Sequence, residues 1–178
     1  LRPGDANEVV ETYRYIMQLR HQPAVLVLSR QPLPTLDRKK YSPASGVARG
    51  AYVLADPSRG NPEVILIASG SEVSLAVEAH EKLVAEGIRS RVVSLPSWEI
   101  FEHQTQEYQD NVLPPQVTAR VAVEQASTFG WERYIGRLGR MIGMKTFGAS
   151  APLKELQRKF GFEPDRVVAA AKELLGRN

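Results

Sequence analysis

The sequence predicts an α/β fold in which a mostly parallel, mixed sheet of five strands lies between two layers of helices. Two observations favour this class. Short apolar runs alternate with segments of helical periodicity along most of the chain, which is the pattern of a parallel sheet covered by helices. Several of these runs are apolar at every position, as in strands that are buried on both faces. A helix and a strand that precede this unit are expected to be the remnant of a second α/β domain.

Composition limits the classes of protein to be considered. The 178 residues are 43% hydrophobic and 24% charged, values that are ordinary for globular proteins and exclude disordered and fibrous classes. No apolar run approaches the roughly 18 residues that cross a bilayer. The net charge of +3 is spread along the chain, so we expect neither nucleic acid nor membrane as a partner. The absence of cysteine excludes disulfides and fits a reducing compartment, and we expect a cytoplasmic protein. The opening Leu-Arg-Pro, without an initiator methionine, indicates part of a longer protein.

The first predicted element is a capped helix. Asp5 and Glu8 have the spacing of a capping box, in which each side chain bonds a free amide at the helix start. Val9, Tyr13 and Ile16 then recur at helical spacing. A Gly-Asp pair can also open a magnesium-diphosphate site, but the cap explains Asp5 better because Glu8 and the apolar helix follow at once.

A strand and a linker follow this helix. Residues 24–28 form a continuous apolar run after Pro23, which predicts a strand buried on both faces. Residues 31–46 contain three prolines, a glycine and a run of charges, which is typical of a stiff polar linker. We therefore place a domain boundary here, with residues 1–41 ending one domain and residues 42–178 forming the next.

The second unit alternates strands with helices. The predicted strands cover residues 51–55, 64–68, 91–95, 119–123 and 141–147. A turn at residues 69–72 leads into a helix that Gly87 ends. Further helical segments are predicted at residues 131–136, 152–160 and 165–175, whereas residues 98–111 are helical or irregular.

The common catalytic motifs are missing from the sequence. It contains neither a phosphate-binding loop nor a zinc-protease motif, and its glycines and serines do not fit a dinucleotide fingerprint or a nucleophile elbow. His80 lies on an apolar helix face and is interpreted as a core histidine. His21 is placed at a helix C-terminus, where a cation suits the dipole, and His103 in a solvated stretch. We therefore assign no catalytic, metal-binding or cofactor-binding residue.

Arg30 is the one candidate for a ligand contact. It follows a predicted buried strand directly, and in open α/β sheets ligands bind beyond the carboxyl ends of the strands. A guanidinium group there offers a planar fork to a phosphate or a carboxylate. The alternative is a surface arginine paired with a neighbouring acid, and the residues alone do not separate the two.

Several stretches of the sequence form an ordered set of motifs. They include Leu-Ser-Arg-Gln at residues 28–31 and Phe-Gly-Ala-Ser-Ala-Pro at residues 147–152, with others at residues 2–8, 67–73, 93–97, 118–124 and 129–131. Through these motifs, which occur in the same order as in the family, the sequence resembles the C-terminal part of transketolase along essentially its whole length.

The resemblance implies a fold and a reaction. Residues 1–41 would be the end of a pyrimidine-binding domain and residues 42–178 a three-layer C-terminal domain. Transketolases transfer a two-carbon ketol group from a ketose phosphate to an aldose phosphate, in the pentose phosphate pathway or the Calvin cycle. They act as homodimers with thiamine diphosphate and a divalent metal, magnesium or calcium. The family's arginine in the Ser-Arg-Gln motif contacts the substrate phosphate, and Arg30 matches it. The cofactor-binding and metal-binding regions have no counterpart here, so we expect this chain alone to be inactive.

Two alternatives remain open. Two-oxo-acid dehydrogenase beta subunits and deoxyxylulose phosphate synthase share the C-terminal architecture, although the two quoted motifs favour transketolase. A free-standing regulatory module is the other alternative, because the turn at residues 69–72 joins a strand to a helix N-terminus, where anions bind readily.

Overall fold

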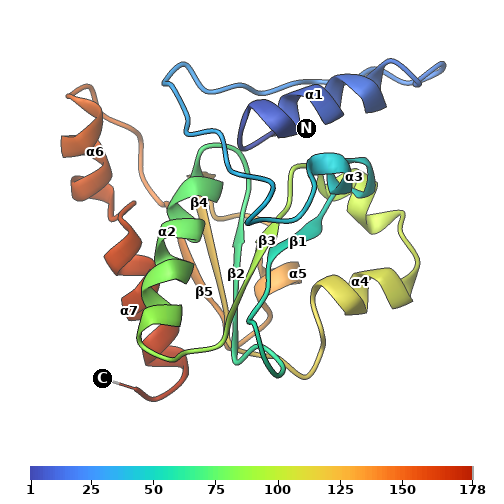
Figure 1. Cartoon of the computed structure of the whole chain (residues 1–178). Coiled ribbons are helices and arrows are strands. Elements are labelled where there is room, and N and C mark those ends of the chain that lie inside the picture. Colours follow the sequence, from blue (N-terminus) through green and yellow to red (C-terminus); the bar gives the residue numbers. More distant parts are fainter. Residues whose placement is uncertain (178) are drawn as a thin grey trace.

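A mixed five-stranded sheet forms the centre of the molecule (Figure 1). The computed structural model describes residues 1–177. The strand order is β1-β3-β2-β4-β5, and only β1 runs antiparallel to its neighbour. The strands are β1 (Tyr52–Ala55), β2 (Val64–Ala68), β3 (Ser90–Ser94), β4 (Arg120–Ser127) and β5 (Arg140–Met144). The predicted fold class is confirmed.

The sheet is covered on both faces because its central strands are apolar at every position. In β2, Leu66 belongs to one core and Ile65 and Ile67 to the other, and all five residues of the strand are buried. Successive side chains of a strand point to opposite faces, so an uninterrupted apolar run requires a cover on each side.

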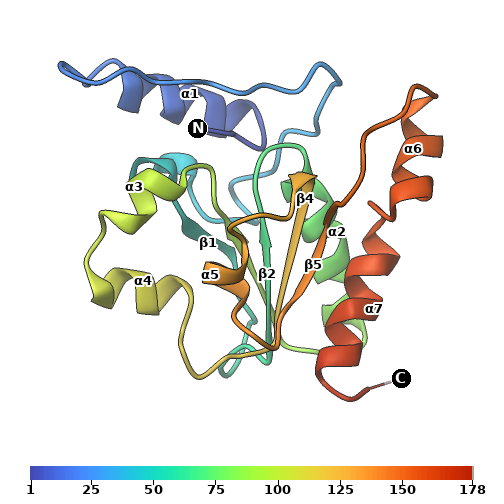
Figure 2. The same cartoon turned by 180° about the vertical axis from the view of Figure 1, so that it is seen from behind.

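Two groups of helices supply these covers (Figure 2). Helices α2 (Glu72–Ala85) and α7 (Pro164–Leu174) pack on one face, with α6 (Leu153–Phe160) beside them. The other face carries α3 (Trp98–Glu102), α4 (Gln106–Val112) and α5 (Glu132–Ile135). The segment predicted as helical or irregular, residues 98–111, is thus two short helices with a break between them. Among residues 1–177, no helix has the length and apolar character that crossing a membrane requires.

Helix α1 (Ala6–Ile16) lies across the carboxyl edge of the sheet (Figures 1 and 2). The predicted cap is confirmed: the amide of Glu8 donates to Asp5 Oδ1 at 2.9 Å. The Glu8 carboxylate returns to the amide of Gly4 at 2.7 Å. Both acids are buried, so the cap also brings two carboxyl groups into the contact between the helix and the sheet edge.

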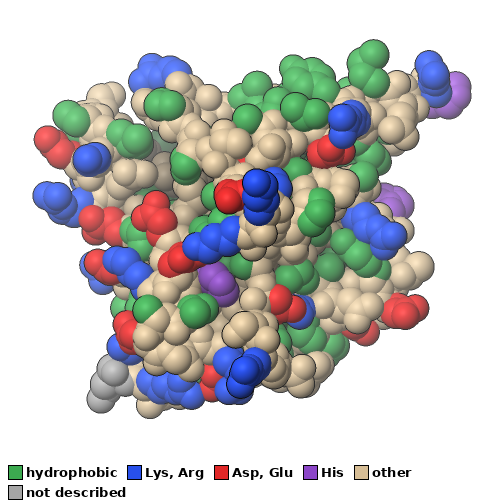
Figure 3. Space-filling view, in the orientation of Figure 1, with side chains coloured by type: hydrophobic (Ala, Val, Ile, Leu, Met, Phe, Trp, Pro, Cys, Tyr) green, Lys and Arg blue, Asp and Glu red, His purple; other side chains and the backbone are tan. Residues whose placement is uncertain are grey.

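Residues 24–28 do not form the buried strand that we predicted. They are extended, but no strand is assigned to them, and Val25 and Leu28 are 72% and 53% exposed. The physical reason is that a strand needs neighbouring strands, and the sheet of the described residues lies elsewhere. Figure 3 shows apolar side chains over the top of the molecule, where α1 and the following segment lie. The prediction of a linker at residues 31–46 agrees better with the structure. Residues 31–43 contain no helix or strand, and the 3-10 helix η1 (Ala44–Arg49) follows them.

Candidate functional site

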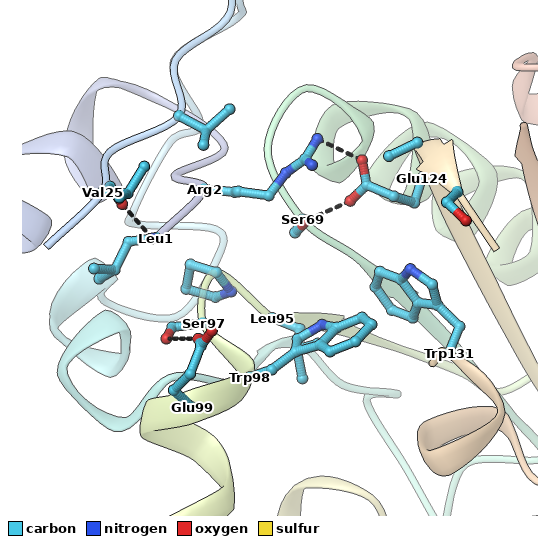
Figure 4. A pocket seen from close by; sticks show the side chains of 14 residues that line it. Leu1, Arg2, Val25, Ser69, Leu95, Ser97, Trp98, Glu99, Glu124 and Trp131 are labelled. Carbon is cyan, nitrogen blue, oxygen red and sulfur yellow. Dashed lines mark hydrogen bonds and ion pairs between the residues drawn. The ribbon is translucent and has the colours of Figure 1, made fainter. Parts of the chain in front are cut away.

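A cavity of about 310 Å³ opens at the carboxyl ends of the parallel strands (Figure 4). It lies between the first residues of the chain and the loops that follow β2, β3 and β4. Arg2, Ser69 and Glu124 form its polar side, and Trp98 and Trp131 form its aromatic side. This is the position at which open α/β sheets bind ligands.

The polar side of the cavity is a connected set of three side chains (Figure 4). Arg2 Nη2 donates to Glu124 Oε1 at 2.5 Å, and Ser69 Oγ donates to Glu124 Oε2 at 2.5 Å. The backbone of Arg2 is fixed as well: its amide donates to Pro96 O at 2.8 Å, and its carbonyl accepts from the amide of Gly70 at 2.9 Å. Arg2 is therefore hydrogen-bonded to the residues that follow the ends of β2 and β3.

Glu124 is an unusual carboxyl group because it is only 2% exposed and has a second buried acid, Glu72, as its neighbour. Burial and then the Glu72 carboxylate raise the pKa of Glu124 to about 8, although Ser69 and Arg2 act in the opposite direction. Glu124 therefore keeps its proton near neutral pH. Glu72 accepts from Ser71 Oγ at 2.5 Å and from the amide of Gln125 at 3.2 Å.

This arrangement disfavours an anion at the turn of residues 69–72. The amide of Gly70 already donates to Arg2, and the carboxyl groups of Glu72 and Glu124 lie beside the turn. A helix N-terminus binds anions through free amides and a positive field, and both are reduced here. The turn is better described as the place where the start of the chain docks.

The aromatic side of the cavity is a packed cluster of rings. The rings of Trp98 and Trp131 meet edge to face with their centroids 5.2 Å apart, and Tyr134 packs against both. Trp131 is 2% exposed. Because edge-to-face pairs add to the free energy gained from area burial, this wall holds the loop after β4 in place.

A second polar cluster lies under α1. Glu8 accepts from Tyr52 Oη at 2.6 Å and from Ser94 Oγ at 2.6 Å, in addition to the amide of Gly4. Burial is the main cause of a raised pKa for Glu8, and the three donors oppose it. Beside it, Arg38 Nη2 donates to Asp5 Oδ1 at 2.8 Å. The cluster ties α1 and the linker to the sheet.

Arg30 lies on the exposed segment that passes the rim of the cavity. Its side chain is exposed, and within the described residues it forms no ion pair. Val25 and Val27, a few residues earlier, line the cavity. Arg30 lies in a local turn, in which the amide of Gln31 donates to Ser29 Oγ at 3.0 Å.

A comparison with known protein families shows to which family this chain belongs. A family profile described as the transketolase-like TK C-terminal domain matches residues 50–163. This chain belongs to the transketolase family. The match covers the sheet and most of its helices, including the strand ends that carry Ser69 and Glu124.

Individual transketolases are similar over nearly the whole chain. Transketolase of Halalkalibacterium halodurans is 50% identical over 175 residues, which are 98% of this chain and 26% of that protein. Transketolase 1 of Escherichia coli is 49% identical over 174 residues, again 98% of this chain and 26% of that protein. The chain thus spans about a quarter of the length of these transketolases.

Solved transketolase structures share the fold. The enzyme from Leishmania mexicana superimposes with a TM-score of 0.89 at 39% identity, over 99% of this chain and 25% of that chain. A Pichia stipitis transketolase, described as a complex with sedoheptulose-7-phosphate, gives 0.86 at 38% identity, over 99% of this chain and 25% of that chain. The transketolase resemblance inferred from the sequence is confirmed.

The histidines play no part in the cavity. His80 is buried on α2 with its Nδ1 atom 2.7 Å from Ser90 Oγ, as a core histidine would be. Helix α1 ends at Ile16, so His21 lies beyond the helix end at which we had placed it. His103 is exposed and contacts the carbonyl of Glu99. Within residues 1–177, no group of three or more His, Cys, Asp or Glu side chains is placed to hold a metal ion.

Sequence reasoning missed Arg2, Ser69 and Glu124 as a group. Each is unremarkable in its own segment, and only the fold brings them together. One signal was available, since Glu124 directly follows an apolar run and continues a strand that is buried on both faces. A charged residue there must find partners, because an unpaired buried charge costs too much free energy.

Proposed function

We propose that this chain supplies the C-terminal quarter of a transketolase, which moves a two-carbon ketol group from a ketose phosphate to an aldose phosphate. In this proposal residues 1–41 end the pyrimidine-binding domain and residues 42–178 form the C-terminal domain. The identity of about 50% to curated transketolases over 98% of the chain is the observation that carries the proposal. The sugar phosphate named for the Pichia stipitis structure supports the substrate class.

The chain's own contribution is binding and scaffolding rather than cofactor chemistry. In this proposal thiamine diphosphate and its magnesium or calcium ion, which the family resemblance implies, are bound by other regions of the enzyme. We expect the chain to be inactive alone and to act in a homodimer with those regions. Cytoplasm remains the proposed location, although some relatives are named chloroplastic.

Arg30 is the proposed contact to the substrate phosphate. Its side chain is exposed, it follows the segment whose Val25 and Val27 line the cavity, and it has no acidic partner among the described residues. A free guanidinium group can therefore donate two parallel hydrogen bonds to a phosphate. The alternative interpretation, an arginine paired with a neighbouring acid, lacks such an acid in the described part of the chain.

Arg30→Ala in the complete enzyme tests this role. We expect the KM for phosphorylated sugars to rise roughly ten- to a hundredfold, because a hydrogen bond between charged groups contributes about 1.5–3 kcal/mol. Arg59→Ala is a matched control, since Arg59 is also exposed but lies in the turn between β1 and β2, at the opposite end of the sheet. An unchanged KM in Arg30→Ala would contradict the assignment.

A further inference from the structure

The outer edge of β5 is an open edge of the sheet. Strand β5 pairs with β4 alone, so about half of its backbone amide and carbonyl groups point away from the sheet. Within residues 1–177, no other backbone segment forms a hydrogen bond with residues 140–144. Figure 2 shows β5 at the margin of the sheet, beside α7.

The opposite edge of the sheet, β1, differs in this respect. The linker passes along it, and the amide of Ser42 donates to Leu54 O at 2.9 Å. Proteins protect edge strands with such covers or with charged side chains, because an open edge pairs readily with another chain. Strand β5 has neither protection beyond its first residue, Arg140, since residues 141–144 are uncharged.

A hollow of about 400 Å³ lies against the β5 edge. Its apolar lining comes from β5, α6 and α7: Met141, Ile142, Phe160, Ala169 and Ala170. The side chains of a strand alternate between its two faces, so an extended segment laid beside β5 would direct every second side chain into this hollow. Leu138 before β5 and Phe147 after it are 65% and 98% exposed, and they offer apolar contacts beyond each end of the strand.

The hollow also carries positive charge. Lys159 and Arg166 line it, and neither forms an ion pair within the described part of the chain. Glu173, which lines it as well, is paired with Arg140 Nη2 at 2.7 Å. A second copy that paired its β5 with this one would bring the same cations together, whereas acidic side chains on a partner strand would balance them.

We propose that the β5 edge is a docking site for an extended, acidic segment of a partner protein, which adds a sixth strand to the sheet. Backbone hydrogen bonds to β5 supply affinity in this mode of recognition, and the hollow selects alternate apolar side chains. The acids of the segment meet Lys159 and Arg166. The inference goes beyond ketol transfer and does not depend on it, because neither cation lines the cavity at the strand ends.

Fluorescence anisotropy of a labelled peptide with the complete enzyme tests the proposal. The probe is a capped hexapeptide that alternates valine and glutamate, and it spans about 20 Å when extended, close to the length of β5. We expect saturable binding that weakens with salt. A hexapeptide with lysine in place of glutamate should bind at least about tenfold more weakly, because the cations of the hollow repel it.

Two methylated peptides test the backbone pairing on the unaltered enzyme. One is N-methylated at the valine amides and the other at the glutamate amides. Successive amides of a strand point to opposite edges, so only one of the two sets faces β5. Strand addition therefore predicts that one methylated peptide keeps the affinity of the parent and that the other loses it by at least about tenfold.

Charge reversal tests the two cations. Lys159→Glu combined with Arg166→Glu should weaken the valine–glutamate peptide at least about tenfold. Arg59→Glu is the matched control, because Arg59 is exposed in the turn between β1 and β2, and it should leave binding unchanged. The ketol-transfer activity should be the same in all of these variants, which shows that they are folded.

Three results would overturn the proposal. They are no saturable binding of the valine–glutamate peptide, an equal effect of the two methylations, and unaltered binding in the charge-reversed enzyme. Sedimentation of the enzyme alone is the remaining measurement. Self-association that the reversed charges abolish would make a second copy the occupant of the edge, and the acidic partner would then be wrong.

Discussion

The hydroxyl of Tyr52 donates to the carboxylate of Glu8 across 2.6 Å and joins the first helix of the chain to the first strand of the sheet. Both residues are buried. The same hydroxyl accepts from Arg38 Nη1 at 3.0 Å, so one phenol connects the helix, the linker and the sheet. The proposed boundary at residues 41 and 42 is thus crossed by a buried polar network, which fixes the end of one unit on the next.

Tyr52→Phe should destabilise the chain by about 1–3 kcal/mol, because a buried carboxylate loses one of its three donors. Urea unfolding measures the change, with an unaltered m value showing that the folded state is otherwise intact. Tyr108→Phe is the matched control: its hydroxyl donates to the neutral carbonyl of Ala51 at 2.8 Å. A cost for Tyr52→Phe no larger than that for Tyr108→Phe would contradict the importance of the Glu8 contact.

The sequence predicted the elements whose partners are in the same chain. Strand β2 has the predicted bounds, because an uninterrupted apolar run is stable only between two helical layers, and both layers are present. Residues 24–28 carry the same pattern but remain exposed. Local sequence fixed their extended backbone, whereas their burial depends on neighbouring strands that the described residues do not provide.

The site was harder to predict than the fold. Arg30 could be singled out because the apolar run before it predicted a strand, although residues 24–28 form no strand in the structure. The link between Arg2 and Glu124 spans 122 positions, and nothing in either segment indicates the other. Such contacts follow from strand order, which places the ends of β2, β3 and β4 side by side. Sequence patterns predict each strand separately and do not give the order of the strands in the sheet.

Arg120→Lys should destabilise the chain by roughly 2–4 kcal/mol, because Arg120 closes a loop with four hydrogen bonds that lysine cannot reproduce. Its Nε donates to Val117 O at 2.9 Å and its Nη1 to Tyr134 O at 2.7 Å. Its Nη2 donates to Leu113 O at 3.0 Å and to Pro114 O at 2.9 Å. Thermal unfolding checks the loss.

Arg133→Lys provides the control for this prediction. Arg133 pairs with Glu102 on the surface, where the two side chains are 50% and 44% exposed to solvent. Surface ion pairs contribute little, so the unfolding temperature should stay close to that of the unaltered chain. Equal losses for the two variants would show that the carbonyl contacts of Arg120 do not stabilise the loop.

Gly50→Ala should cost more than Gly87→Ala, although both glycines have a positive φ, +81° and +75°. A Cβ at residue 50 would lie 2.2 Å from the amide nitrogen of Phe101 and 2.6 Å from the carbonyl of Ser97, so helix α3 would have to move. A Cβ at residue 87 meets no atom within 4 Å. We expect about 1–2 kcal/mol for Gly87→Ala from backbone strain, and about 1–3 kcal/mol more for Gly50→Ala. Equal losses of unfolding free energy in Gly50→Ala and Gly87→Ala would contradict the close approach of α3 to residue 50.

Glu124 should give the fold a pH dependence opposite in sign to that of a carboxylate in an exposed salt bridge. Burial and the Glu72 carboxylate raise its pKa to about 8 in the folded chain, whereas an unfolded glutamate titrates at about 4.3. Between these values the folded state keeps a proton that the unfolded state has released. The free energy of unfolding therefore falls as the pH rises through this window, and the loss is complete above the folded pKa.

Glu124→Gln removes this titration, so the variant should gain stability relative to the unaltered chain between about pH 5 and about pH 8, by at least about 1 kcal/mol, the equivalent of one pKa unit. Urea unfolding at a series of pH values gives the difference. Glu63→Gln should behave in the opposite way: the amide of Arg89 is the main cause of a lowered pKa for Glu63, so that group stabilises the fold above its unfolded pKa. A difference for Glu124→Gln that stays flat or reverses would mean that Glu124 is ionised throughout in the folded chain, with the Arg2 charge outweighing burial and Glu72.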